Sequence, residues 1–444
     1  MKATDFTKIA TPEEFWRQIP RSLEENIQWR MMLHEFLDRD TGAQKVFQSM
    51  CVAYPPIFFD AVAWTLNPKK RPGSRNWPFI LRDAQIPVVW MLKSGIDNGH
   101  DVGIEKSREE GATELCMKLF CLYLLCVPET QILIGSRTED EVEKAGDRFT
   151  LMAKADYTLA HLPPWWRRQL QIEDTHLHLG NKLNNSCIDG EATSLHFGAS
   201  NRATAVLLDE FGRTDYGVGK SILGSVNDVT NCVIFSSTHW LGMNHPFNQA
   251  LQRATTKVVR LPWWENPEKS QGLYRSPEPG IIEIIDIDYY RRRVPEVFDP
   301  IQPNTPIKYR EFEARLQLQP PEVQNKLAAL QGDVRDALFV ADGCLKFPKK
   351  LRSPWHDYEE IRRDPRDLMS NGSADAVFPG ELLSQIKAET VKDPAAVGEV
   401  EIRYDSGGHV TGGVFRRASH TKRFKWWGDL EGGRPNQKHN YAIG

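Results

Sequence analysis

The sequence predicts an α/β fold with a mainly parallel sheet. Between about residues 79 and 265, short apolar segments typical of buried strands alternate with longer segments of helical periodicity. A stretch rich in Pro, Gly and basic residues at 67–78 marks a first boundary, and Pro and charged residues become frequent after 265. We therefore expect a mostly helical region at 1–75, an α/β core at 76–270, a mixed α+β subdomain at 271–395, and a hairpin with a linker at 396–444.

The individual elements follow from local patterns. The segment TPEEFWRQIP begins with a Thr cap and acids in its first turn, and NIQWRMMLHEFLDRD spaces its apolar residues as a helix does. The core elements are predicted as strands at 102–107, 131–136, 204–210, 231–238 and 257–264, helices at 112–127 and 139–155, and an antiparallel insertion at 186–198. The later elements are predicted as strands at 280–290 and 423–430, helices at 357–368 and 381–390, and a hairpin with a Gly-Gly turn at 400–417.

Composition narrows the class of protein. Of the 444 residues, 40% are hydrophobic and 26% charged, a balance typical of folded soluble domains. The longest apolar run, near 115–127, is too short to span a bilayer, and the N-terminus lacks the apolar core of a secretory signal, so we expect a cytoplasmic protein without membrane contact. Cys116, Cys121 and Cys126 share one predicted helix, and no CxxC pair is present, so buried reduced thiols are expected.

The segment GIEKSREEGATELC, 103–116, has the plan of a phosphate-binding loop. An apolar strand enters a polar loop, and a Gly and a hydroxyl residue then open a helix, whose first N–H groups and dipole favour an anion. In the common pattern GxxxxGK[ST], Gly111 and Thr113 fill the second Gly and the hydroxyl position, whereas Ala112 stands in the Lys position and Lys106 in the first Gly position. The lysine has in effect moved to the start of the loop. Taken alone, the pattern also fits an ordinary strand–turn–helix with a solvated loop.

A second motif lies about 100 residues further along the chain. TAVLLDEFGRTD, 204–215, is a buried strand that ends in Asp209 and Glu210. In phosphate-loop ATPases an Asp at this place holds the magnesium shell, and the next Glu polarises water. The alternative is a strand that happens to end in an acidic turn. The order and spacing of the two motifs together favour an ATPase.

Taken in order, these motifs resemble the terminase large subunits of tailed double-stranded DNA viruses. The resemblance is clearest over about 54–265 and weaker over 266–380, where SPWHDYEEIRRDP and DAVFPGELL look like the end of a motor region. The segments that carry it are FFDAVAWTLNPKK, FILRDAQIPVV, IEKSREEGATE, ILIGSRTEDEVEK, TAVLLDEFGRTD, VIFSSTHWLGMNHPFNQAL and VVRLPWWENPEKS. The resemblance implies a phosphate-loop ATPase of the ASCE type. It also implies that NYAIG, 440–444, begins the first strand of a truncated RNase H-like nuclease domain.

The resemblance implies roles for individual residues. The nucleotide-binding set would be Gln85, Lys106, Ser107, Arg108, Glu109, Glu110, Gly111, Ala112 and Thr113, with Gln85 contacting adenine. Thr113 and Asp209 would hold Mg²⁺, while Glu210 would orient the attacking water and Arg108 would add catalytic charge. Ser237 and Thr238 would sense the γ-phosphate and couple hydrolysis to motion. Each side chain also has an ordinary reading, as a helix cap, a solvated loop or a hydroxyl at a strand end.

The same resemblance implies the partners. ATP hydrolysis would move double-stranded DNA through a portal protein, by a homo-oligomeric ring that also binds a terminase small subunit, in the host cell cytoplasm. With a net charge of −3, any DNA contact must be local or shared between subunits. The basic and aromatic segments 289–293, 415–427 and 163–170 are candidates for it, although such segments are more often packed strands and the WW pairs more often core. A helicase-like ATPase and a non-catalytic DNA- or portal-binding scaffold remain the alternatives.

Overall fold

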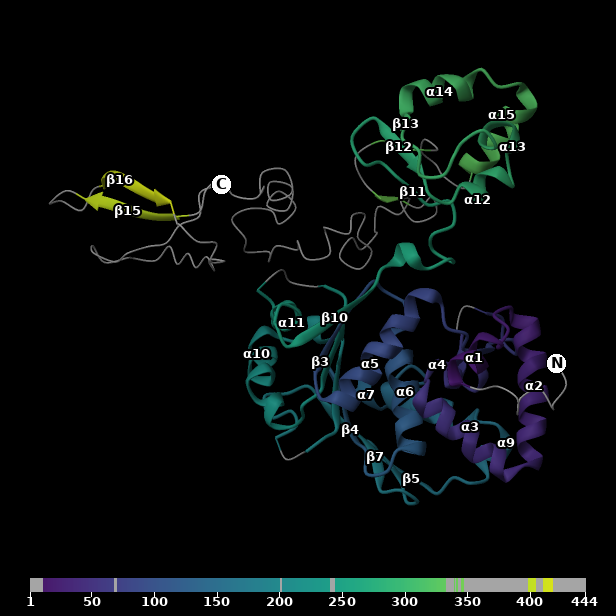
Figure 1. The fold of residues 1–444 in the computed structure, drawn as a ribbon, viewed down its shortest axis with the longest axis vertical. Helices are drawn as coiled ribbons and strands as arrows, with labels where there is room; N and C mark the ends of the chain where they lie inside the picture. Colours follow the sequence, from purple (N-terminus) through teal and green to yellow (C-terminus); the bar gives the residue numbers. More distant parts are fainter. Residues whose placement is uncertain are drawn as a thin grey trace. The chain divides into compact units, whose positions relative to one another are not determined.

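The computed structural model describes residues 11–67, 70–199, 202–239, 244–332, 339, 341, 345–346, 398–404 and 410–417. The chain divides into two compact units, residues 1–371 and 372–444, which are treated separately (Figure 1). The elements predicted at 357–368, 381–390 and 423–430, the segments 353–365 and 375–383, the linker at 431–437 and the strand at 440–444 lie outside the described residues.

The N-terminal region is helical, as predicted from its caps and periodicity. Its helices are α1 (Pro12–Arg17), α2 (Leu23–Arg39), α3 (Thr41–Ala53) and α4 (Pro56–Ala61), and a short hairpin of β1 (Trp64–Leu66) and β2 (Asn76–Pro78) follows. Thr11 and Glu14 form a capping box that starts α1. The buried Arg30 of α2 donates to the carbonyl oxygens of Phe59, Asp60 and Ala63, so it satisfies the open end of α4.

The core is one eight-stranded sheet with the order β10-β3-β9-β8-β4-β7-β6-β5. The first six strands pair in parallel, and β6 and β5 add an antiparallel edge, so the predicted mainly parallel sheet is confirmed. The strands are β3 (Asp101–Lys106), β4 (Gln131–Ser136), β5 (Ile172–Thr175), β6 (His178–Asn181), β7 (Ser186–Ala192), β8 (Ala205–Asp209), β9 (Val233–Ser237) and β10 (Thr256–Leu261). One strand, β9, separates β3 from β8.

Helices cover both faces of this sheet, because alternate strand residues point to opposite sides. In β8, Leu207 packs in the cluster that also holds the N-terminal helices, α5 and α6, whereas Leu208 packs in the cluster with α10 and α11 (Figure 1). The helices of the core are η2 (Asp83–Gln85), α5 (Ile86–Asn98), α6 (Ala112–Cys126), α7 (Glu139–Val142), α8 (Leu151–Ala160), α9 (Pro164–Arg167), η3 (Phe211–Arg213), α10 (Tyr216–Ser225), η4 (Val226–Asp228), α11 (Pro246–Leu251) and η5 (Trp263–Glu265). Trp165 and Trp166 are buried, as expected of core residues. None of the helices in the described residues is long and apolar enough to cross a membrane.

Four predicted elements differ in the structure. The helix expected at 139–155 is two helices, α7 and α8, because Gly146 adopts a positive φ of 80° and Thr150 caps a new helix. The strand expected at 280–290 ends at Ile284, since the Asp286 side chain caps a helix that follows. The insertion at 186–198 is only partly antiparallel: β7 pairs with β6 in that sense but runs parallel to β4. Pro262 likewise ends β10 before the tryptophans that were expected in the strand.

The remaining elements form a mixed lobe and a separate hairpin. The lobe contains β11 (Tyr274–Arg275), β12 (Ile281–Ile284), α12 (Ile287–Arg291), α13 (Pro295–Phe298), β13 (Ile307–Lys308), α14 (Tyr309–Gln317), α15 (Pro321–Gly332) and β14 (Leu345–Lys346), with an antiparallel sheet of order β13-β12-β11-β14 around its own apolar core. In the second unit, β15 (Gly398–Tyr404) and β16 (Val410–Arg417) pair antiparallel as the predicted hairpin, whose turn lies outside the described residues.

Candidate functional site: a phosphate loop beside an acidic strand end

The phosphate loop joins the carboxyl end of β3 to the start of α6. Gly111 has a φ of 81°, and Glu109, although not a glycine, has a φ of 60°. These left-handed residues turn the chain sharply, so that the loop enters α6 at Ala112. Gly111 has no side chain with which to cap α6, which leaves the first N–H groups of this 15-residue helix directed at the loop. Such an end is suited to bind an anion.

The hydroxyl of Thr113 meets the carboxylate of Asp209. The Thr113 Oγ1 donates to Asp209 Oδ1 at 3.1 Å and Oδ2 at 2.9 Å, although the two residues lie 96 positions apart in sequence. Asp209 is the last residue of β8 and Thr113 the second of α6. Because β3 and β8 run in the same direction, the loop and the acid come to the same edge of the sheet, where ligands bind in such folds.

The displaced lysine pairs with the second acid. Lys106 Nζ lies 2.6 Å from Glu210 Oε1, and the lysine side chain is 7% exposed against 35% for the glutamate. Glu210 has a positive φ of 51°, a backbone conformation that is costly for a residue with a side chain. The Arg213 Nε lies 4.0 Å from the other carboxylate oxygen of Glu210. The two acids thus have different partners. Asp209 accepts from the Thr113 hydroxyl, whereas Glu210 pairs with the Lys106 ammonium.

The pKa directions agree with this division. Burial by itself disfavours the charged lysine, but the charges of Glu210 and Asp209 outweigh it and raise the pKa of Lys106. Burial also disfavours the charged form of Glu210, yet Lys106 nearby lowers the net pKa of that carboxyl, with help from Arg213 and Arg108. Burial raises the pKa of Asp209, against the opposing charge of Lys106. Asp209 is therefore the acid that takes up a proton more readily.

Glu110 holds the loop in place. Its carboxylate is 2% exposed and accepts from Arg82 Nη1 at 2.9 Å, Asn266 Nδ2 at 3.0 Å and Lys269 Nζ at 2.5 Å. Its carbonyl oxygen accepts from Arg82 Nη2 at 2.7 Å and from Gln85 Nε2 at 3.0 Å. Three segments of the chain therefore meet at one buried carboxylate. An ion cluster of this kind fixes geometry more than it adds stability.

The other predicted loop residues have distinct surroundings. Ser107 is buried and tied to the end of β10, since its Oγ accepts from the N–H of Trp263 at 3.1 Å. Arg108 and Glu109 are exposed, and Lys269 donates to the Arg108 carbonyl. The Gln85 amide is 4% exposed and spans from the Glu110 carbonyl to the N–H of Arg82, at 3.0 Å each. Its contact with adenine remains a prediction, while its contact with the loop is observed.

Ser237 ends β9, the strand that lies between β3 and β8, and Thr238 follows directly after it. The register pairs Ser237 with Glu105 on one side, and Ser236 with Asp209 on the other. Within the described residues, the hydroxyls of Ser236, Ser237 and Thr238 are buried without a hydrogen-bond partner. A Cβ on Gly212 would lie 2.5 Å from the Thr238 carbonyl and 2.7 Å from Ser237 Oγ. The turn after Glu210 is therefore packed closely against this strand end. Such close packing is compatible with the predicted coupling role.

Oxygen ligands at this edge fit magnesium. The described residues contain no group of three or more His, Cys, Asp or Glu that would enclose a metal ion. Mg²⁺ usually keeps several waters and takes one or two protein oxygens together with substrate phosphates. The Thr113 hydroxyl and the Asp209 carboxylate supply that number and that kind of ligand. The site fits Mg²⁺ bound together with a nucleotide better than a protein-only metal site.

Several residues of the site were missed by sequence reasoning. Arg82, Asn266 and Lys269 surround Glu110, and none belongs to a recognised phosphate-loop pattern. A signal for two of them was present. Because β10 is expected to end at the same sheet edge as β3, the polar residues just after it, 265–270, are placed beside the loop.

Comparisons with known proteins find similar structures among phage large terminases. No protein-family model and no curated protein matches the sequence. The solved structures that it matches include the large terminase of HK97 bacteriophage (15% identity, TM-score 0.37, 63% of this chain and 53% of that chain). They also include the large terminase of a thermophilic bacteriophage in complex with ADP (11%, 0.34, 48% and 50%) and the ATPase domain of the Thermus phage P74-26 large terminase (15%, 0.29, 38% and 78%). The match spans about half the length of the first two of these chains.

Proposed function

We propose that this chain is an ATP hydrolase, the motor part of a terminase large subunit that packages viral DNA. The observation that carries the proposal is the convergence of Lys106, Thr113, Asp209 and Glu210 at one edge of the sheet. It supplies a phosphate-binding cation, two oxygen ligands for a metal ion and a carboxylate for water in a single place. Strand β9 between the loop strand and the acid strand agrees with an ASCE-type ATPase.

The residues would share the work as follows. The start of α6 and Lys106 would bind the β- and γ-phosphates, with Arg108 adding charge from the exposed part of the loop. Thr113 and Asp209 would hold Mg²⁺, which offsets the phosphate charge when it is bound. Glu210 would accept a proton from the attacking water. Ser237 and Thr238, with unpaired hydroxyls beside the acids, would register the γ-phosphate.

The Lys106–Glu210 pair suggests how ATP turns the site on. With one oxygen of Glu210 bound to the ammonium at 2.6 Å, the lysine charge lowers the pKa of the carboxyl and makes it a weaker base. A γ-phosphate offers Lys106 a more highly charged partner, so binding of ATP would release Glu210 toward water. Substrate binding would in this way assemble the catalytic arrangement.

The biological setting belongs to the proposal. The motor would act as a homo-oligomeric ring on the portal protein, with a terminase small subunit, and would move double-stranded DNA into a procapsid in the host cytoplasm. An endonuclease that cuts concatemeric DNA is expected only in a longer chain. The order of the motifs along the sequence, together with the residues that converge at the sheet edge, supports this setting.

Phosphate release by the purified chain tests the enzymatic part. We expect turnover of ATP that requires Mg²⁺, stops with EDTA and rises with duplex DNA. The Glu210→Gln protein, purified in parallel, controls for contaminating ATPases. A chain that binds ATP but shows no more phosphate release than this control would instead be a non-catalytic scaffold, and ATP-dependent strand separation would indicate a helicase.

A further inference from the structure

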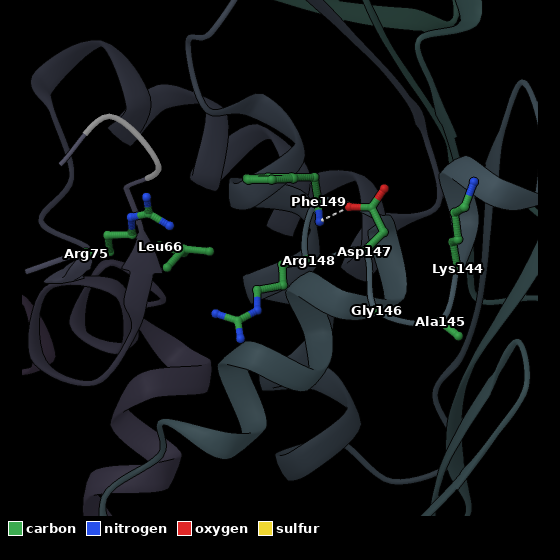
Figure 2. Close-up of a pocket in the computed structure, with 8 residues that line it drawn as sticks. All are labelled: Leu66, Arg75, Lys144, Ala145, Gly146, Asp147, Arg148 and Phe149. Carbon is green, nitrogen blue, oxygen red and sulfur yellow. Dashed lines mark hydrogen bonds between the residues drawn. The ribbon is translucent and has the colours of Figure 1, made fainter. Parts of the chain in front are cut away.

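A cavity of about 450 Å³ lies between the β1–β2 hairpin and the loop that joins α7 to α8 (Figure 2). The hairpin contributes Leu66 and Arg75, and the loop contributes residues 144–149. This volume lies within the range of small-ligand sites and is large enough for one nucleotide unit. The cavity uses none of the residues of the phosphate site.

Positive charge dominates the lining. The lining residues include three cations, Arg75, Lys144 and Arg148, and one acid, Asp147, whose carboxylate accepts from the N–H of Phe149 at 2.9 Å (Figure 2). Lys144 is already paired with Asp140 at 2.6 Å. By contrast, within the part of the chain that the structure describes, neither Arg75 nor Arg148 forms an ion pair. Arg75 Nε donates to the Lys70 carbonyl at 3.2 Å, but neither guanidinium charge is balanced by an acid of the described residues, and planar guanidinium suits phosphate.

An exposed aromatic ring stands beside these cations. Phe149 is 60% exposed, which is unusual for a side chain of its size. On the hairpin, Lys70 lies 4.8 Å from the centre of the Trp77 ring, and Arg71 is exposed next to it. Cations that can bind phosphates, beside an open apolar ring that can pack against a sugar, suit the backbone of a nucleic acid.

The loop also connects to the phosphate site. Lys154 of α8 donates to the carbonyl of Phe149 and, at 3.3 Å, to that of Thr150. Burial lowers the pKa of Lys154, while the charges of Glu114 and Asp209 act in the opposite direction. The Lys154 ammonium therefore holds the cavity loop, and its pKa also responds to the charge of Asp209.

We propose that this cavity binds the sugar–phosphate backbone of double-stranded DNA, with phosphates at Arg75 and Arg148 and a deoxyribose against Phe149. The choice of DNA as the partner rests on the proposed function, whereas the anion-binding character rests on the cavity alone. The surface was not among the basic segments that the sequence suggested. Of those, 163–170 contributes buried tryptophans, and Arg291 of 289–293 donates to the Ile301 carbonyl.

Binding of a short fluorescein-labelled blunt DNA duplex to the full chain, followed by anisotropy between about 50 and 200 mM salt, tests the proposal. Arg75→Ala combined with Arg148→Ala should weaken binding about tenfold or more and flatten the slope of log affinity against log salt by about 2, since each phosphate contact contributes about 0.9. Phe149→Ala should weaken binding with the slope unchanged, because no charge is removed.

The matched control removes two arginines elsewhere. Arg17→Ala combined with Arg39→Ala removes two exposed arginines, one from α1 and one from α2. It changes the net charge by the same amount as the cavity variant and should leave the salt slope as in the parent. Basal ATPase activity without DNA should stay at the parent level in both double variants, which also verifies that they fold. The inference is overturned if the cavity variant binds the duplex like the control, or if only binding of single-stranded DNA is reduced. A parent chain without ATPase activity would sink the proposed function but leave this binding test intact.

Discussion

The predicted phosphate loop makes an ionic contact near each end, and the two contacts differ. At its start, Lys106 meets Glu210, a partly exposed acid that follows a strand on the far side of β9. Near its end, Glu110 is buried among Arg82, Asn266 and Lys269. In the first contact, Lys106 is hydrogen-bonded to one oxygen of Glu210, and Arg213 lies 4.0 Å from the other oxygen. The second is a cluster in which every carboxylate oxygen is occupied.

These two contacts lie within five residues of the chain, 106–110. A cation that has only one acid as its hydrogen-bonded partner can be taken over by a phosphate at modest cost. A carboxylate shared by three donors cannot be released without leaving buried charge unpaired. The loop therefore gains a movable cation at one end and a fixed anchor at the other. The predictions that follow test whether each end behaves as assigned.

The largest effect is expected at Glu210. Glu210→Gln keeps the size of the side chain but removes the base, so turnover should fall by about 10²–10⁴-fold. ATP binding should change little, because the side chain is proposed to act on water. Single-turnover kinetics together with equilibrium binding of a fluorescent ATP analogue measure both. Hydrolysis at the parent rate would show that Glu210 serves only to hold Lys106.

The next effect concerns the displaced lysine. Lys106→Ala should reduce turnover by about 10²–10³-fold, the usual loss when a charge-stabilising donor is removed. Lys106→Arg should also be impaired, since a planar fork does not replace a compact ammonium. Ala112→Lys, which restores the common loop pattern, should not fully rescue Lys106→Ala, because Ala112 is buried against the core.

Arg108 provides the competing account. If Arg108 is the working cation, Arg108→Ala should abolish turnover and Lys106→Ala should leave it nearly normal. The structure places Lys106 in hydrogen-bond contact with Glu210, and the charge of Arg108 also lowers the pKa of that acid. Steady-state kinetics on the two single variants therefore decide which cation matters.

The movable end of the loop was predictable from sequence, and the anchor was not. Lys106, Thr113 and Asp209 stand at fixed positions relative to strand ends, and parallel strands bring their carboxyl ends to one edge. The strands were also predictable, because a buried strand such as β8, predicted at 204–210 and observed at Ala205–Asp209, is a short apolar run with clear limits. Glu110 is surrounded by residues 82, 266 and 269, whose approach depends on how loops fold over that edge.

Breaks within helices and strands were missed for a related reason. Periodicity predicts one helix at 139–155, but Gly146 and the Thr150 cap decide locally that there are two. This break creates the loop that lines the basic cavity. Sequence reasoning likewise treated 67–78 as a boundary, where the structure has a hairpin that forms the other wall. Predicting 67–78 only as a domain boundary says nothing about which residues that segment contacts.

A smaller effect is expected at the anchor. Glu110→Gln keeps the shape of the side chain but leaves Arg82 and Lys269 without their carboxylate, which should lower the free energy of unfolding by about 1–3 kcal/mol. The KM for ATP should rise more than kcat falls, because the loop is positioned and not chemically altered. Denaturant unfolding and steady-state kinetics measure the two.

A surface pair provides the control for the anchor. Glu13→Gln removes one acid from an exposed pair with Arg17 and should change the free energy of unfolding by less than about 1 kcal/mol. Combining Glu110→Gln with Lys269→Met should cost less than the sum of the single changes, since each already breaks the same contact. Additive losses, or a Glu110→Gln protein as stable as the control, would contradict the anchor.

The smallest effect is a pH dependence that distinguishes Asp209 from Glu210. Burial raises the pKa of Asp209, whereas Lys106 outweighs the effect of burial and lowers the pKa of Glu210. As the pH falls from neutral, Asp209 should therefore take up a proton before Glu210 does. Because a metal ligand must be deprotonated, the gain in ATP affinity that Mg²⁺ provides should be lost first, by up to about tenfold for each pH unit below the pKa of Asp209.

Titrating ATP with and without Mg²⁺ at several pH values measures this loss. Binding in EDTA should change much less over the same range, because Lys106 keeps its charge there and its pKa is raised. The Asp209→Asn protein should show a small Mg²⁺ effect at every pH. If the Mg²⁺ effect instead persists in acid as far as the ordinary range of an aspartate, the metal is held mainly by Thr113 and the phosphates. Asp209 would then serve chiefly to orient the Thr113 hydroxyl through the hydrogen bonds it already makes.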